Sequence, residues 1–336
     1  NNVGDPFGTS GYLRMHTHEF EREVIAQFAK WTHAPDDDHW GYVTNGGTEG
    51  NMYGIYLARE LYPNGLVYFS EDTHYSVTKI MRLVRARNIM IKSQSSGEID
   101  YDDLRESIRL HHDVPPIIFA NIGTTMKGAV DNLGRIHEIM EELVIREFYI
   151  HCDAALSGMI LPFIEQAQPF DFAAGAHSIS ISGHKFIGSP LPCGVVLARR
   201  HNVDRIARSV EYVGALDTTL SGSRNAFTPL LLWYAIKRWG EAGFRDLVGQ
   251  CLTRADYAIA RFAEADIRAW RNENSITVVF PRPSDELLKR WQVAPFQKIG
   301  HLIPLPHVTE ELVNEFVDEV AKDLLSQNQK SPVNQP

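Results

Sequence analysis

The sequence predicts an α/β fold in which a mostly parallel central sheet forms the core of a large domain. Short apolar runs recur along the chain, separated by segments with helical periodicity. Pro116–Asn121 and Phe148–Cys152 are almost continuously apolar, as strands covered on both faces of a parallel sheet are. Ser178–Ser182 alternates isoleucine with serine, the period-two pattern of a strand. Polar residues follow these strands, at the edge where open α/β sheets bind ligands.

Length and pattern together predict more than one domain. The chain has 336 residues, and single hydrophobic cores stop growing at roughly 250–300 residues. The alternation of strands and helices changes near residue 236. We expect four regions: an N-terminal segment over 1–30, a large domain over 31–235, a small C-terminal α+β domain over 236–325, and a disordered polar tail over 326–336.

Composition excludes several classes of function. A net charge of −9 without a basic patch argues against nucleic acid as a partner, and no apolar run approaches the ~20 residues of a membrane span. Three cysteines form no disulfide framework and favour a reducing cytoplasm. His16 and His18 have no third ligand nearby, so no metal site is predicted. The first residue is Asn1, and we expect a native N-terminal segment to be missing.

The remaining elements follow from local patterns. Helical periodicity, with Pro229 before one helix and acidic residues opening another, predicts helices over 19–31, 49–61, 77–87, 100–110, 131–144, 230–239, 252–263 and 310–325. Apolar runs predict further strands over 40–44, 66–69, 89–92, 193–198 and 274–281. Residues 1–18 are expected to be extended and to lie on another surface, such as a partner subunit. Residues 209–225 show neither period and are expected to form a functional or mobile polar loop.

A glycine pair between a predicted strand and a predicted helix forms a candidate anion site. Asn45-Gly46-Gly47-Thr48 follows the strand and opens the helix. Two glycines let backbone N–H groups approach an anion, Thr48 adds a hydroxyl, and the start of the helix favours negative charge. The segment is neither a P-loop nor a dinucleotide fingerprint. It is typical of a phosphate cradle, with an ordinary Asn-Gly turn and capped helix as the alternative.

Lys185 is the candidate nucleophile. It follows the strand 178–182 after Gly183 and His184, at the ligand-binding edge of the sheet. A lysine beside an apolar strand is partly desolvated, which favours the uncharged, nucleophilic amine. The chemistry that most needs such an amine is imine formation with a carbonyl cofactor, above all pyridoxal phosphate. Taken alone, a solvated turn lysine is the alternative.

Asp153 and His74 support the same cofactor. Asp153 directly follows a buried strand, and a buried carboxylate keeps a pyridine nitrogen protonated. Ala154 and Ala155 leave room for a ring, and Lys185 is about one ~30-residue βαβ unit away, so both groups can reach one crevice. His74 lies at another strand-to-helix corner, where its ring could stack on an aromatic cofactor. Helix capping is the alternative role for both residues.

In their order along the chain, these motifs resemble the group II pyridoxal-phosphate-dependent amino-acid decarboxylases of fold type I. Within that family the sequence is most similar to the short branch of bacterial histidine decarboxylases and plant serine decarboxylases. The resemblance covers nearly the whole chain and rests on Gly41–Asn51, Asp72–Ser76, Asn121–Thr125, His151–Ala155, Ser182–Lys185 and Gly222–Asn225. It implies fold type I, pyridoxal phosphate, decarboxylation of an L-amino acid with histidine first, and a homodimer with the active site at the subunit interface.

The resemblance also implies a role for each matching residue. Lys185 would form the imine with the cofactor, Asp153 would pair with the pyridine nitrogen, and His74 would stack on the ring. The other implied contacts are Ala155 with the opposite ring face, Gly47, Thr48, Ser182 and His184 with the phosphate, Thr125 beside the ring substituents, and Tyr212 as the proton donor to the substrate carbon.

The sequence departs from that branch near the expected substrate pocket. Ala226-Phe227 stands where the compared enzymes tend to read Gly-His, and Leu216 stands where they are more polar. Serine and a more apolar amino acid are therefore alternative substrates. An aminotransferase of the same fold would clamp the substrate carboxylate with an arginine, for which Arg224 and Arg271 are candidates. An inactive cofactor-binding homologue is the remaining alternative.

Overall fold

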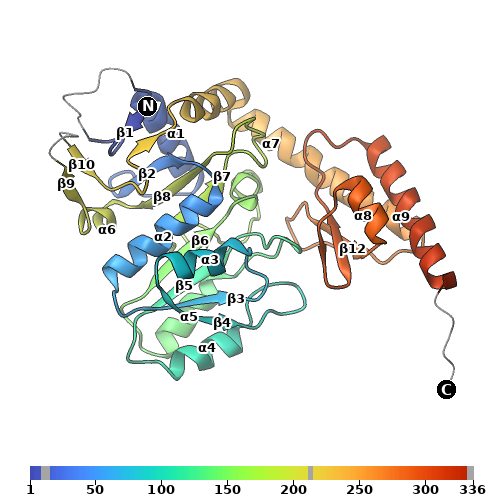
Figure 1. Cartoon of the computed structure of the whole chain (residues 1–336), viewed down its shortest axis with the longest axis horizontal. Coiled ribbons are helices and arrows are strands. Elements are labelled where there is room, and N and C mark those ends of the chain that lie inside the picture. Colours follow the sequence, from blue (N-terminus) through green and yellow to red (C-terminus); the bar gives the residue numbers. More distant parts are fainter. Residues whose placement is uncertain (9–15, 211–214, 331–336) are drawn as a thin grey trace. The chain divides into compact units, whose positions relative to one another are not determined.

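The computed structural model describes residues 1–8, 16–210 and 215–330 (Figure 1). Contacts divide the chain into a first unit, residues 1–124 and 129–242, and a second unit, residues 125–128 and 243 onward. Helix α7, Phe227–Glu264, runs through the sequence-based boundary at 235/236 and leaves helical geometry at Gly240, where φ is 59° and ψ is −174°.

Among the described residues, a seven-stranded sheet forms the centre of the first unit, in the order β2-β8-β7-β6-β5-β3-β4. Its strands are β2 His39–Thr44, β3 Leu66–Ser70, β4 Arg87–Ile91, β5 Pro116–Asn121, β6 Tyr149–Asp153, β7 Ser178–Ser182 and β8 Gly194–Arg199. Pairings from β7 to β4 are parallel, whereas β8 is antiparallel to both β7 and β2. The predicted α/β class with a mostly parallel sheet is confirmed.

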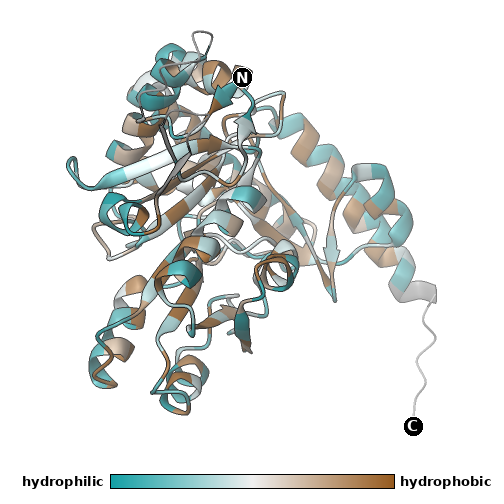
Figure 2. Cartoon of the chain, turned by 60° about the vertical axis from the view of Figure 1, so that its left-hand side comes forward, coloured by the Kyte–Doolittle hydropathy of each residue, from teal (hydrophilic) through white to brown (hydrophobic). Residues whose placement is uncertain are grey.

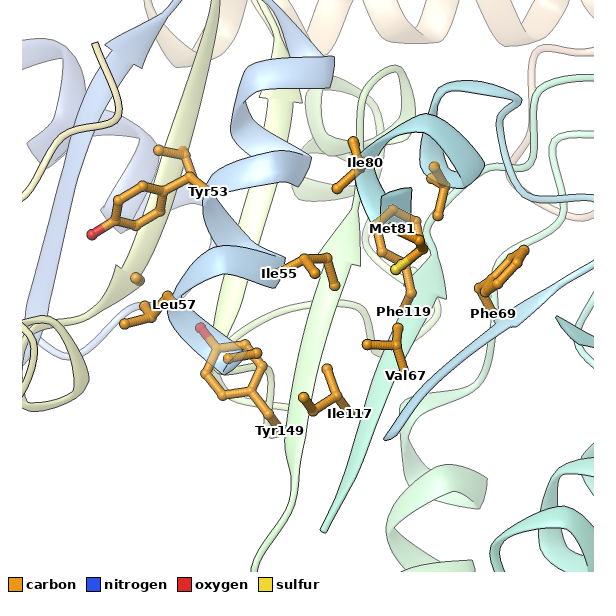
Figure 3. Close-up of a cluster of buried hydrophobic side chains, with 14 of the residues drawn as sticks. Tyr53, Ile55, Leu57, Val67, Phe69, Ile80, Met81, Ile117, Phe119 and Tyr149 are labelled. Carbon is orange, nitrogen blue, oxygen red and sulfur yellow. The ribbon is translucent and has the colours of Figure 1, made fainter. Parts of the chain in front are cut away.

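Helices of the first unit alternate with these strands. They are α1 His18–Trp31, α2 Gly47–Leu61, α3 Ser76–Leu83, α4 Tyr101–Arg109, α5 Leu133–Glu142 and α6 Arg200–Asp204, with 3₁₀ turns at Ser157–Met159 and Leu161–Phe163. Figure 2 shows hydrophilic and hydrophobic residues alternating along the helices, as amphipathic helices require. Tyr53, Ile55 and Leu57 of α2 belong to one buried cluster with side chains of β3, β5 and β6 (Figure 3).

Helix α3 is shorter than the sequence pattern predicts. It ends at Leu83 rather than Arg87, because Arg85 adopts a left-handed φ of 50° and the Ala86 N–H donates to the Met81 carbonyl at 3.0 Å. This backward bond is the usual way in which a left-handed residue closes a helix. Arg87 then begins strand β4 opposite Leu66.

The segment 209–225 contains short strands that the sequence pattern does not reveal. Strand β9 (Arg208–Val210) pairs with β10 (Ala215–Asp217), and β11 (Ser223–Arg224) pairs with β1 (Asn2–Val3). Strands of two or three residues are too short to show a period. Within the opening segment, expected to lie on another surface such as a partner subunit, Asn2 and Val3 thus pair with their own chain.

A buried polar cluster secures this N-terminal pairing. The Asn2 amide donates to the Glu21 carboxylate at 2.7 Å, and Glu21 also accepts from the Val43 N–H at 2.8 Å and from the Arg224 guanidinium. Arg224 donates in turn to the Gly4 carbonyl at 3.0 Å. Asn2 and Gly4 therefore complete the hydrogen bonding of a buried ion pair, and removing a partner of such a pair leaves an uncompensated charge.

The second unit has its own small sheet and core. Strands β12 (Val278–Pro281), β14 (Ile299–Leu302) and β13 (Pro295–Phe296) form an antiparallel sheet, accompanied by α8 (Asp285–Trp291) and α9 (Glu310–Lys330). Phe262 stacks on Phe280 with ring centroids 5.0 Å apart. Helix α9 continues through residues 326–330, which composition had placed in the tail. None of the helices in the described ranges has the length and apolar character that a bilayer crossing demands.

Stability is expected to fall as the pH drops below neutrality. Burial lowers the pKa of His151 to about 3 and those of His18 and His177 to about 4, from an ordinary 6.5. Below pH 6.5 the unfolded chain therefore binds protons at imidazoles that stay neutral when folded, which favours unfolding. Asp131 acts in the opposite sense, because burial raises its pKa to about 7 and the folded state gains that proton first.

Counting only the three imidazoles whose pKa falls furthest and the Asp131 carboxyl, the unfolded state binds about two more protons than the folded state between pH 6 and 5. The lowered pKa values of His74 and His301 act in the same direction as those three. Each proton contributes roughly 1.4 kcal/mol per pH unit. Unfolding free energies from urea titrations at pH 7.5, 6.5, 5.5 and 5.0 should decrease at each step below 6.5. The variant His18→Gln should show a shallower decrease. A free energy that stays constant from pH 7.5 to 5.0 would contradict this expectation.

Candidate active site

The carboxyl ends of β6 and β7 bring several sequence-predicted residues together. Asp153, the last residue of β6, is the register partner of Ser180 on β7. Two residues beyond this pair on each of the two segments, the Ser182 N–H donates to the Ala155 carbonyl at 3.1 Å. Lys185 follows in the loop between β7 and β8 and is partly buried. This is the sheet edge at which ligands bind in open α/β folds.

The glycine pair lies directly beside this edge. Gly46 caps helix α2 with a φ of 135°, a conformation that favours glycine. A Cβ on Gly47 would stand 2.8 Å from Ser182 Oγ and 3.7 Å from Ala155 Cβ, so α2 begins in contact with the end of β7. The His184 ring faces Gly46 and is fixed by a 2.8 Å hydrogen bond between Nδ1 and the Cys193 carbonyl. Helix-start amides, a hydroxyl and an imidazole thus lie close together, as the donors of an anion site would.

His74 lies within electrostatic range of both Asp153 and Lys185. Burial lowers the pKa of His74, the Asp153 carboxylate acts in the opposite direction, and the Lys185 and Lys79 ammonium groups add to the lowering. Its Nδ1 is 2.8 Å from Ser76 Oγ, which sets the orientation of the ring. His74, Asp153 and Lys185, which the sequence predicts as the reactive residues, therefore lie in the same region of the fold.

Asp153 is held from two sides. Its side chain is 8 % exposed, Oδ2 accepts a hydrogen bond from Asn51 Nδ2 at 2.8 Å, and Oδ1 accepts from the Ala155 N–H at 3.2 Å. A buried carboxylate held by two donors is suited to pair with a cationic ligand group.

For the other predicted site residues, the structure gives a position but no contact with Asp153 or Lys185, or it gives no description. Thr48 is exposed on the first turn of α2, and Phe227, which begins α7, is 56 % exposed. Thr125 belongs to the second unit, and its predicted place beside a ring stays a prediction. Leu216 lies on β10, while Tyr212 falls outside the described residues.

Neither candidate arginine has the character of a free carboxylate clamp. Arg224 is 3 % exposed and forms an ion pair with Glu21. Arg271 belongs to the second unit and is paired with Asp256, with 2.6 Å between Nη2 and Oδ1. The charges of both guanidinium groups are already matched within the chain.

Sequence reasoning missed Asn51 and His151, which lie behind Asp153. Asn51 comes one helical turn after Gly47 and therefore lies on the same face of α2. His151 comes two residues before Asp153 and therefore lies on the same face of β6. Both signals were present in the sequence, but only the packing of α2 on β6 connects them.

Comparison with known proteins decides the family. The model of the pyridoxal-dependent decarboxylase conserved domain matches residues 16–280. The chain belongs to the pyridoxal-dependent decarboxylase family. The predicted resemblance, the enzyme class and the cofactor pyridoxal phosphate are thereby confirmed.

Individual relatives of this decarboxylase are similar over almost its full length. Histidine decarboxylase of Pseudomonas entomophila (strain L48) is 49% identical, with 95% of this chain and 80% of the relative covered. Histidine decarboxylase of Morganella morganii is 48% identical, covering 96% of this chain and 86% of the relative. L-methionine decarboxylase from Streptomyces sp. 590 superimposes with a TM-score of 0.86 at 26% identity, covering 97% of this chain and 87% of that chain.

The residues of the site fit pyridoxal phosphate. The cradle of Gly46 and Gly47 leaves free the position that a side chain would fill against Ser182, as the approach of a phosphate requires. Asp153 offers a buried carboxylate for a pyridinium nitrogen, and Lys185 offers an amine for the aldehyde.

Adding a methyl group at Gly47 is expected to weaken cofactor binding. In Gly47→Ala the new Cβ would stand 2.8 Å from Ser182 Oγ and displace that hydroxyl. Losing one hydrogen bond to a charged group corresponds to roughly 10- to 100-fold in affinity. Titrating the apo forms of the wild type and of Gly47→Ala with pyridoxal phosphate measures this loss of affinity. Gly249→Ala is the matched control, since a Cβ there meets nothing within 4 Å. Equal affinities in the two variants would refute the cradle.

Proposed function

We propose that this decarboxylase converts L-histidine to histamine and CO₂. The observation that carries the proposal is the 48–49% identity, over 94–97% of the chain, to relatives named histidine decarboxylase. The 26% identical structural relative acts on methionine, so the fold itself accommodates different amino acids.

Lys185, Asp153 and His74 are proposed as the reactive centre. Pyridoxal phosphate supplies an electron-accepting ring that stabilises the charge left on Cα when the carboxylate departs. Asp153 would hold the proton on the ring nitrogen, and Lys185 would provide the amine for the cofactor aldehyde. The lowered pKa of His74 keeps its imidazole uncharged near neutral pH, which suits a ring that stacks on a cationic heterocycle.

The cradle residues are proposed to bind the phosphate and orient the ring. Gly47 and the start of α2 offer backbone N–H groups, and Thr48, Ser182 and His184 offer side-chain donors. Ala155 would pack on the ring face opposite His74. Tyr212 is proposed to deliver the proton to Cα, and Leu216 and Phe227 to contact the substrate.

The buried ion pair of Arg224 favours decarboxylation over transamination. Since Glu21 neutralises Arg224, that guanidinium is not free to bind the α-carboxylate of a substrate. A carboxylate without a matching cation is more easily lost as CO₂, because the departing group sheds its charge.

A substrate panel tests the proposal. Purified protein loaded with pyridoxal phosphate is incubated with L-histidine, L-serine, L-methionine and the other common amino acids, and CO₂ and amine are measured by mass spectrometry. Histamine with one CO₂ per turnover, at a kcat/KM at least ten times that of every other amino acid, is the expected result. Preference for serine or methionine overturns the substrate, and a keto acid without CO₂ overturns the reaction. No turnover of any amino acid indicates an inactive homologue.

The assembly and compartment are further proposals. Phe227, Tyr234 and Trp239 on the first part of α7 are 56%, 59% and 44% exposed, which suits a surface covered by a second copy. The three cysteines are buried and unpaired, as suits a reducing cytoplasm. Sedimentation velocity of the cofactor-loaded protein should give twice the mass of one chain, and a monomer would contradict the dimer.

A further inference from the structure

A continuous row of buried side chains extends from Asp153 into the core. Asp153 Oδ2 accepts from Asn51 Nδ2 at 2.8 Å, Asn51 Oδ1 is 3.0 Å from His151 Nε2, and His151 Nδ1 is 2.7 Å from Ser178 Oγ. Asn51 is 2 % exposed, and His151 and Ser178 are fully buried. The reaction as proposed uses only the first member of this row.

In this row, the donor and the acceptor of each hydrogen bond follow from the chemistry of the side chains. A carboxylate only accepts, so the Asn51 amide must turn its nitrogen toward Asp153 and its oxygen toward His151. His151 must then carry its proton on Nε2, and its Nδ1 must accept from the Ser178 hydroxyl. Burial lowers the pKa of His151 to about 3, so the ring is uncharged whenever the enzyme works near neutral pH.

Close packing holds the row in place. A Cβ on Gly54 would lie 2.0 Å from His151 Nδ1 and 2.4 Å from His151 Cε1, so α2 rests directly on the imidazole ring. Asn51 and Gly54 are on the same side of α2, one helical turn apart. The helix that forms the anion cradle at its first turn therefore also sets the position of Asn51 on its second.

We propose that Asn51 is a positioning residue that holds the Asp153 carboxylate in the orientation in which it can pair with the ring nitrogen of the cofactor. This inference rests on the proposed role of Asp153. The amide N–H donates to Oδ2 while the Ala155 N–H donates to Oδ1, and together the two bonds fix the plane of the carboxylate. The neutral His151 fixes the amide without adding a positive charge that would compete with a pyridinium for Asp153.

Affinity for two cofactors tests this role without relying on turnover. Asn51→Ala and wild-type apoenzyme are titrated with pyridoxal phosphate and with its analogue in which carbon replaces the ring nitrogen. Asn51→Ala is expected to bind pyridoxal phosphate about 10- to 100-fold more weakly, the effect of one hydrogen bond to a charged group. Its affinity for the carbon analogue should change by less than about threefold, because that ring cannot pair with Asp153. Equal losses for both ligands, or no loss for either, would overturn the proposal.

A double-variant cycle provides the second measurement. In an Asp153→Asn background, Asn51→Ala should weaken pyridoxal phosphate binding by less than about threefold further, since the charge that Asn51 serves is gone. Fully additive losses would overturn the proposal. Circular dichroism checks the fold, and Asn51→Ser carries the same comparisons if Asn51→Ala does not fold. Wild-type enzyme that binds pyridoxal phosphate but releases no CO₂ from histidine contradicts the substrate, while the ratio of the two affinities still decides the role of Asn51.

Discussion

Replacing Lys185 with alanine is expected to remove both the visible absorption band of the cofactor-loaded enzyme and its decarboxylase activity. Lys185 follows β7 in a partly buried loop, within electrostatic range of His74, and its amine is the group proposed to react with the cofactor aldehyde. Without it the cofactor is held only by non-covalent contacts. Turnover should therefore fall by more than the roughly 10²–10⁴-fold contributed by a single acid–base group.

Absorbance spectra and CO₂ release of purified protein measure this effect. The matched control is Lys79→Ala, which removes another positive charge near His74 from an exposed position, where the ammonium lies 5.1 Å from the Tyr75 ring centroid. Lys79→Ala should retain the band and most of the turnover. A Lys185→Ala protein with the wild-type band would show that another amine attaches the cofactor.

Asp153→Asn is expected to have the second largest effect. The substitution preserves the shape of the side chain but removes the carboxylate that is proposed to keep the ring nitrogen protonated. The ring then accepts electrons less well, and kcat should fall by about 10²–10³-fold, the scale on which one electrostatic contact to developing charge contributes. With pyridoxal phosphate at a saturating concentration, the loss should appear mainly in kcat for the amino acid, because the proposed cradle is unchanged.

A cofactor methylated at the ring nitrogen separates charge from general damage. Its positive charge is permanent, so it should restore part of the lost activity in Asp153→Asn and give no gain in the wild type. Asp102→Asn is the control, because its side chain is 88% exposed on α4. If the methylated cofactor left Asp153→Asn unimproved, the carboxylate would have a role other than protonating the ring.

The sequence was informative wherever strands are long and buried. Pro116–Asn121 and Ser178–Ser182 coincide with β5 and β7, because strands buried on both faces must be apolar and small alternating residues must fit under α2. The position of Asp153 and Lys185 at one sheet edge followed from topology alone. Parallel strands place their carboxyl ends together, so two motifs about 30 residues apart converge.

The parts that sequence reasoning missed depend on contacts between distant segments. The short strands β1 and β11 pair across more than two hundred residues, and neither is long enough to show a pattern. The sequence predicts that the helix 77–87 continues past its actual end, because Arg85, which adopts the left-handed conformation that closes the helix, has an ordinary helix propensity. Asn51 and His151 belong to different motifs, and their hydrogen bond exists only because Gly54 lets α2 rest on the imidazole.

The pairing of β1 with β11 has a consequence for biosynthesis. Asp5 accepts from the Trp40 indole and from Thr218, and Gly4 accepts from Arg224, bonds that join residues separated by up to 220 positions. On the ribosome the first residues therefore emerge long before the segment that completes their partners. Until position 224 has left the exit tunnel, Glu21 carries its charge without its arginine. Nascent chains halted before Arg224 has emerged should be readily cleaved near residues 2–5, and longer nascent chains should resist cleavage there.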